Sequence, residues 1–101
     1  MSTLDASKIK KIVIACDAGM GSSVMLASQL STSLAGHVTV EHTPVNEIPG
    51  DADLVVCQQS LIKRARAAAP DKAVLGFQMF LGDPVFKRLE KAIKSGGELE
   101  Y

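Results

Sequence analysis

This sequence of 101 residues has few aromatic residues and no net charge. Tryptophan is absent and aromatic residues make up only 4% of the chain, while 47% of its residues are hydrophobic. The core must therefore be built mainly from Val, Ile, Leu and Ala. Eleven basic and eleven acidic side chains give a net charge of zero, without the broad positive surface that nucleic-acid-binding proteins normally carry. We expect no nucleic-acid partner.

Cysteines are few and long apolar runs are absent. Two cysteines are too few for a disulfide framework, and no basic leader with an apolar core precedes the first apolar segment. The longest apolar run is far shorter than the ~20 residues that a membrane span needs. We expect a soluble, cytoplasmic domain without direct membrane insertion. A role in membrane transport would require another chain to supply the membrane part and hold this one at its inner face.

Apolar runs alternate with segments of helical period, which is typical of a small α/β domain. The predicted strands are 12–15, 37–42, 53–57 and 73–77. The predicted helices are 22–34, 60–69 and a last one that begins at Asp83 and Pro84 and ends at Gly96, with a short helical turn near 45–48. Right-handed crossovers favour a four-stranded parallel sheet of order 2-1-3-4 with helices on both faces. The predicted fold is a single-domain, three-layer α/β/α arrangement of Rossmann-like type.

The pattern also predicts how the chain is divided and how its first helix packs. Residues 1–8 show no sustained period and are expected to form a loose lead-in, followed by a domain over 9–95 and a tail over 96–101. Met25, Leu26, Leu30 and Leu34 recur at helical spacing and form the expected buried face of the first helix.

The junction between the first strand and the first helix carries the candidate chemistry. Cys16 ends the apolar run and precedes a small-residue loop with two glycines. Loop amides and the unpaired N–H groups of a helix's first turn converge on one point and attract an anion. The same groups favour a thiolate, so Cys16 is the candidate nucleophile and phosphoryl acceptor. The candidate phosphate-binding residues, Asp17 by its amide only, are Asp17, Ala18, Gly19, Met20, Gly21, Ser22 and Ser23.

The run from Cys16 to Ser23 resembles the phosphorylation loop of the mannitol-type IIB domains of the bacterial phosphoenolpyruvate-dependent sugar phosphotransferase system. The match is strong over residues 9–26, and the order of elements stays compatible to about residue 94. The resemblance implies that Cys16 accepts a phosphoryl group from a phosphohistidine of a IIA protein. It also implies transfer to a sugar, a hexitol such as mannitol, that crosses the membrane through a IIC transporter. No metal and no cofactor are expected.

Two other functions stay open. The chain also resembles low-molecular-weight cysteine phosphatases in shape, with the nucleophile after the first strand and an Asp-Pro pair at residues 83–84. Those enzymes carry an arginine six positions after the cysteine, where this chain has Ser22. Without that guanidinium, hydrolysis loses its main electrostatic stabiliser and a phosphocysteine carrier is favoured. A non-catalytic regulatory module with the same fold is the second alternative.

Nucleotide-binding loops are disfavoured. A dinucleotide loop needs a third small residue where Val24 stands, and a Walker loop needs a lysine after Gly21.

Other residues of interest also have ordinary structural roles open to them. Cys57 at the end of the third strand is either a small core residue or the partner of Cys16 in a reversible disulfide. His37 and His42 are expected to face solvent on an edge strand away from the loop, without metal-ligand spacing. An apolar rim for docking partners is expected from Met20, Val24, Met79, Phe80 and Leu81.

Overall fold

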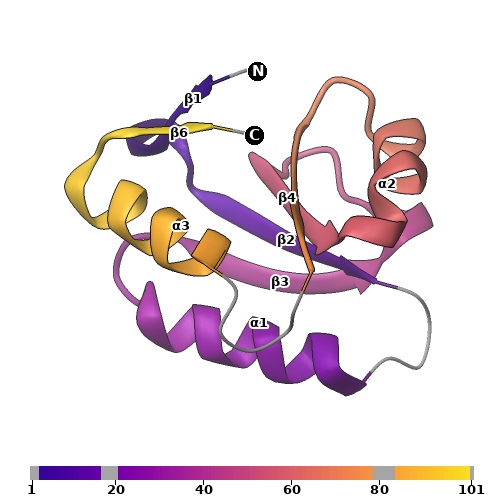
Figure 1. Ribbon diagram of the computed structural model, residues 1–101, viewed down its shortest axis with the longest axis horizontal. Helices are drawn as coiled ribbons and strands as arrows, with labels where there is room; N and C mark the ends of the chain where they lie inside the picture. The colour runs from indigo at the N-terminus through magenta and orange to yellow at the C-terminus, as the bar shows by residue number, and fades with distance from the viewer. Residues whose placement is uncertain (1–2, 17–20, 79–83, 101) are drawn as a thin grey trace.

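The computed structural model describes residues 3–16, 21–78 and 84–100, and its centre is a parallel sheet of four strands (Figure 1). The strands are β2 (Lys11–Cys16), β3 (Thr39–Pro44), β4 (Leu54–Gln58) and β5 (Ala73–Phe77). They lie in the order β3-β2-β4-β5, which is the order predicted from the sequence. All three pairings are parallel, so the carboxyl ends of the four strands meet at one edge of the sheet.

Helices cover both faces of this sheet (Figure 1). One face packs against α1 (Gly21–Ser33) and α3 (Pro84–Ser95). The other face packs against α2 (Ile62–Ala68), which follows the short 3-10 helix η3 (Gln59–Leu61), and against η2 (Val45–Glu47). This is the three-layer α/β/α arrangement predicted from the pattern, with α1 as the crossover from β2 to β3 and α2 as the crossover from β4 to β5.

The strand pleat divides the apolar residues into two cores, because successive side chains point to opposite faces. The core beneath α1 and α3 includes Ile12, Ile14, Leu30, Leu34, Leu54, Val56 and Leu89. The core beneath α2 includes Val13, Ala15, Val55, Cys57, Leu61, Ala65 and Val74. Even-numbered residues of β2 therefore face α1 and odd-numbered ones face α2. This alternation decides which side chains meet at the carboxyl edge.

The packing of α1 differs from the prediction at one residue. Leu26, Leu30 and Leu34 are buried as expected. Met25 is 62% exposed, however, so its predicted place on the buried face is wrong. Positions spaced by four residues align along one side of a helix, and Met25 lies a full helical step of about 100° from that line.

The two ends of the chain form a second, antiparallel sheet. β1 (Thr3–Asp5) pairs with β6 (Glu98–Glu100), with Leu4 opposite Leu99. After the 3-10 helix η1 (Ala6–Lys8), whose Ala6 N–H donates to the Gly97 carbonyl at 2.9 Å, the chain enters β2. The expected loose lead-in and tail are wrong for these residues. Strands of three residues are too short to show a period, and each partner lies at the other end of the chain.

A charged cluster fixes the amino-terminal edge of the large sheet. The Asp53 carboxylate accepts hydrogen bonds from the backbone N–H groups of Lys10 and Lys11 at 2.9 and 3.0 Å. The Lys11 ammonium in turn pairs with Asp51 at 2.9 Å and with Glu41 at 3.0 Å. These contacts join the starts of β2 and β4 and leave the opposite, carboxyl edge for the candidate site.

Candidate functional site

Cys16 is the last residue of β2, the inner strand between β3 and β4. From β2 the chain passes through α1 to β3 on one side of β2, and it then crosses to the other side of β2 to form β4. Open α/β sheets bind ligands at the carboxyl ends of the strands where the order reverses in this way. The Cys16 residue is only 3% exposed. Its sulfur therefore lies at a position typical of ligand sites and is largely shielded from solvent.

The side chain that meets this sulfur is His42 of β3. Its Nε2 atom lies 2.8 Å from Cys16 Sγ, within hydrogen-bond reach. The Thr43 carbonyl oxygen is 3.7 Å from the same sulfur. In the parallel register Ile14 is opposite His42 and Cys16 is opposite Pro44, so Cys16 and His42 are diagonal neighbours on the face that packs against α1. The register of two strands brings the thiol and the imidazole together.

The prediction that His42 lies away from the loop is wrong. Its strand extends to Pro44, two residues beyond the predicted end, and runs parallel to β2. Its carboxyl end therefore reaches the same edge as Cys16. The predicted exposure of His42 is confirmed. His37, which precedes β3, is also exposed and lies toward the amino-terminal edge beside Lys10.

The predicted phosphate-binding residues divide into two groups. Asp17, Ala18, Gly19 and Met20 lie outside the residues that the structure describes. Gly21, Ser22 and Ser23 are the first three residues of α1, whose backbone N–H groups have no partner within the helix. Helix α1 thus begins five residues after Cys16, and the start of α1 lies on the same side of the molecule as the end of β2 (Figure 1). That these amides hold a phosphate stays a prediction.

The expected docking rim is described only in part. Val24, near the start of α1, is 54% exposed, as an apolar rim requires. The other four members, Met20, Met79, Phe80 and Leu81, lie outside the described residues, as does Asp83. Pro84 begins α3, as predicted.

Cys57 lies on the strand next to Cys16, but its side chain is on the opposite face of the sheet. It pairs with Ala15 and belongs to the core beneath α2, whereas Cys16 faces α1. Since the two Cβ atoms point to opposite faces, the hypothesis of a Cys16–Cys57 disulfide is wrong. Burial raises the pKa of the Cys57 thiol to about 11, against a smaller opposing effect of Arg66. Cys57 is thus the small core residue of the alternative prediction.

Within residues 3–16, 21–78 and 84–100, no three His, Cys, Asp or Glu side chains gather as a metal site would require. None of the helices in the same ranges combines the length and apolar character of a membrane span.

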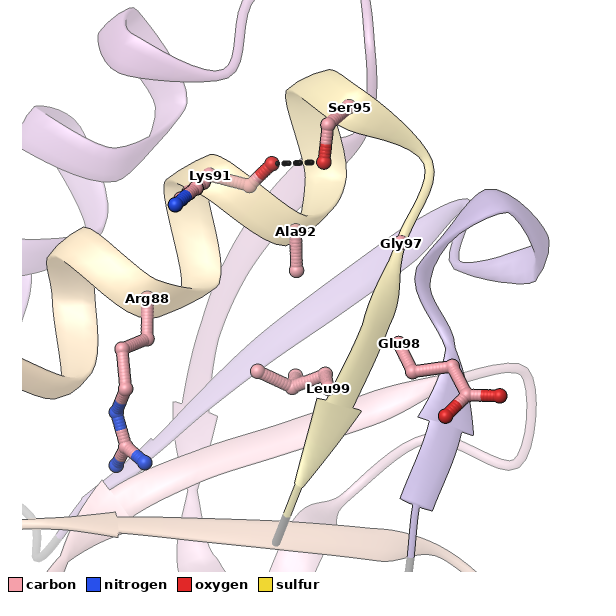
Figure 2. A pocket seen from close by; sticks show the side chains of 7 residues that line it. All are labelled: Arg88, Lys91, Ala92, Ser95, Gly97, Glu98 and Leu99. Carbon is pink, nitrogen blue, oxygen red and sulfur yellow. Dashed lines mark hydrogen bonds between the residues drawn. The ribbon is translucent and has the colours of Figure 1, made fainter.

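A hollow in the described part of the chain is lined by residues near the carboxyl terminus (Figure 2). It has a volume of about 310 Å³ and lies between α3 and β6, where Arg88 and Leu99 face each other across it. Ser95 Oγ donates to the Lys91 carbonyl at 2.7 Å on its rim. Because β6 pairs with β1, which leads into the start of β2, this hollow lies toward the amino-terminal edge of the sheet and contributes nothing to the cysteine site.

The fold and the site together define a class: a small α/β domain with a shielded cysteine at the switch point of a parallel sheet. Residues 11–92 match the model of the family described as "PTS system, Lactose/Cellobiose specific IIB subunit". The match covers most of the chain, so this protein belongs to that family. The resemblance noted from the Cys16 loop is confirmed at this level.

Curated relatives carry names of the mannitol branch. The "PTS system mannitol-specific EIICB component" of Geobacillus stearothermophilus is 42% identical over 91 residues, covering 87% of this chain and 19% of that protein. The "PTS system mannitol-specific EIICBA component" of Buchnera aphidicola is 40% identical over 91 residues, covering 86% and 14%. The lactose-specific IIB domain of Streptococcus pneumoniae has a TM-score of 0.49 at 20% identity, covering 87% and 94%. This chain thus spans about a fifth or less of those curated relatives.

Proposed function

We propose that this chain is a phosphocysteine carrier of a sugar phosphotransferase system. Cys16 accepts a phosphoryl group from a phosphohistidine of a IIA protein or domain and passes it to a sugar held by a IIC membrane transporter. The observation that carries the proposal is the place of Cys16, at the carboxyl end of β2 and five residues before the start of α1, in a chain whose family is that of IIB subunits.

The positions of Cys16 and the start of α1 support phosphoryl transfer to the cysteine sulfur. A thiolate at Cys16 Sγ attacks phosphorus, and charge on the phosphoryl oxygens is taken up by positioned N–H donors, as in phosphoryl transfer generally. The first-turn amides of α1 at Gly21, Ser22 and Ser23 are donors of this kind, and the amides of residues 17–20 are expected to add to them. This transfer needs neither a metal nor a redox cofactor.

The partners follow from the names of the relatives. Those names join the B component to a C component, and in one group also to an A component. We infer that this chain works between a IIA phosphohistidine donor and a IIC transporter, at the cytoplasmic face of the membrane. The mannitol-specific names also favour a hexitol as the sugar.

Intact-mass spectrometry tests the carrier function. The protein is incubated with phosphoenolpyruvate, the two general phosphotransferase proteins and a mannitol-type IIA protein. We expect one phosphoryl group on the native protein and on Cys57→Ala, and none on Cys16→Ser. Label on the Cys16→Ser variant would contradict the assignment of the acceptor. If no IIA protein gives an adduct and an aryl phosphate is turned over instead, the chain is a phosphatase.

A further inference from the structure

The contact between Cys16 and His42 goes beyond what a phosphate-binding loop requires. The two atoms, Sγ and Nε2, are 2.8 Å apart, while the cysteine is 3% exposed and the histidine is an exposed residue. The ring therefore touches both the shielded sulfur and the solvent. Both side chains are held by strands in fixed register, Ile14 opposite His42 and Cys16 opposite Pro44. The register of β2 and β3 thus places the two side chains together.

We propose that His42 is a catalytic residue that takes the proton of the Cys16 thiol and holds the resulting thiolate beside an imidazolium. This inference rests on the carrier function proposed above. An imidazole within hydrogen-bond reach is the usual base for a nucleophilic cysteine, and a neighbouring cationic ring stabilises the thiolate. With Nδ1 protonated, Nε2 accepts the S–H proton; after transfer, Nε2–H donates to the sulfur.

On this face of the sheet, α3 carries the charged residues Lys87, Arg88, Glu90, Lys91 and Lys94, whereas the elements packed against β3 carry few. β3 packs against β2 and α1, and α1 contains no acidic or basic residue. On β2, Lys11 lies at the far end and pairs with Asp51 and Glu41. The adjacent Glu41 is turned to the other face of β3 by the pleat. Asp17 lies outside the described residues. Among the described residues, His42 is a titratable side chain in direct contact with the Cys16 sulfur.

The chemical step balances with these two residues and the phosphohistidine donor. The S–H bond of Cys16 breaks and its proton moves to Nε2 of His42. The S–P bond forms as the N–P bond of the donor breaks, and the electron pair of that bond stays on the donor nitrogen. A donor ring protonated on its other nitrogen leaves as neutral imidazole. His42 then stands as an imidazolium beside the thiophosphate dianion on Cys16.

The rate at which iodoacetamide alkylates Cys16 tests this role without phosphoryl transfer. His42→Asn keeps a polar amide at the position but cannot take a proton, and His37→Asn is the matched control at an exposed histidine away from the sulfur. The alkylated peptide is quantified by mass spectrometry between about pH 5.5 and about pH 9. We expect His42→Asn to react roughly tenfold more slowly at about pH 7, with a profile shifted toward that of an ordinary thiol. His37→Asn should match the native protein.

Two further measurements separate chemistry from a merely structural effect. Added imidazole should restore part of the alkylation rate in His42→Ala but change nothing in the native protein. The initial rate of phosphoryl uptake from the IIA donor should fall on the order of 10²-fold in His42→Asn. Circular dichroism confirms that each variant is folded.

The outcomes distinguish the two proposals. If the alkylation profile of His42→Asn equals that of the native protein, His42 has no such role, whatever the phosphorylation assay shows. If the native protein takes up no phosphoryl group, the carrier function fails, and the alkylation profiles still decide whether His42 holds the proton of Cys16.

Discussion

The buried thiol of Cys57 makes the stability of the fold sensitive to alkaline pH. Cys57 is fully buried, and burial raises its pKa from 9.0 to about 11. Because the pKa is higher in the folded state, the unfolded chain ionises first as pH rises. The stabilisation is complete below about pH 9 and is lost as pH rises toward 11. A shift of about 2 units corresponds to roughly 3 kcal/mol of unfolding free energy when the transition is complete.

Urea unfolding of the native protein and of Cys57→Ala measures this loss. At about pH 10.5 most of the transition has occurred, so the native protein should lose about 2 kcal/mol more than the variant relative to about pH 7.5. The cavity left by the substitution lowers the stability of the variant at both pH values, so the comparison isolates the thiol. Parallel losses in the two proteins would show that Cys57 is solvated in the folded state and refute its assignment to the core beneath α2.

Two predictions concern other parts of the fold. Asp53→Ala should lower the unfolding free energy by about 2 kcal/mol, because the N–H groups of Lys10 and Lys11 lose a charged acceptor; Asp51→Ala, at an exposed ion pair, should change it little. Equal effects in urea unfolding would contradict the distinction. Leu99→Ala should cost about 2–4 kcal/mol by opening a cavity in the core beneath α1 and α3, with unchanged alkylation of Cys16. An unchanged unfolding midpoint would mean that β6 is not anchored there.

The parallel sheet could be predicted because its strands appear in the sequence as short apolar runs separated by helical patterns. The uninterrupted apolar run of residues 12–15 is typical of a strand covered on both faces, and right-handed crossovers leave few ways to order such strands. The β1–β6 pair could not be predicted. Its two strands have three residues each and lie at opposite ends of the chain, so neither a period nor a local turn connects them.

The candidate site could be predicted only where it depends on local sequence. The position of Cys16 at the end of β2 is predictable, because an apolar run, two glycines and a helical pattern follow one another directly in the sequence. The approach of His42 to Cys16 depends instead on the register between β2 and β3. This register cannot be predicted from the sequence, because the two strands are joined by a helix and not by a tight turn. The opposite orientation of Cys57 depends on the pleat in the same way. A parallel alignment of 11–16 with 39–44 would have placed His42 on the face of Cys16.

The central claim is that Cys16 carries a phosphoryl group between two partners. Its most direct test is intact-mass spectrometry of the native protein after incubation with a phosphorylated IIA protein, before and after addition of membranes that contain the IIC transporter and mannitol. The account predicts one phosphoryl group that appears on Cys16 and disappears as mannitol phosphate forms. A phosphoryl group on any other residue, or one that stays on Cys16 when transporter and sugar are present, would contradict it.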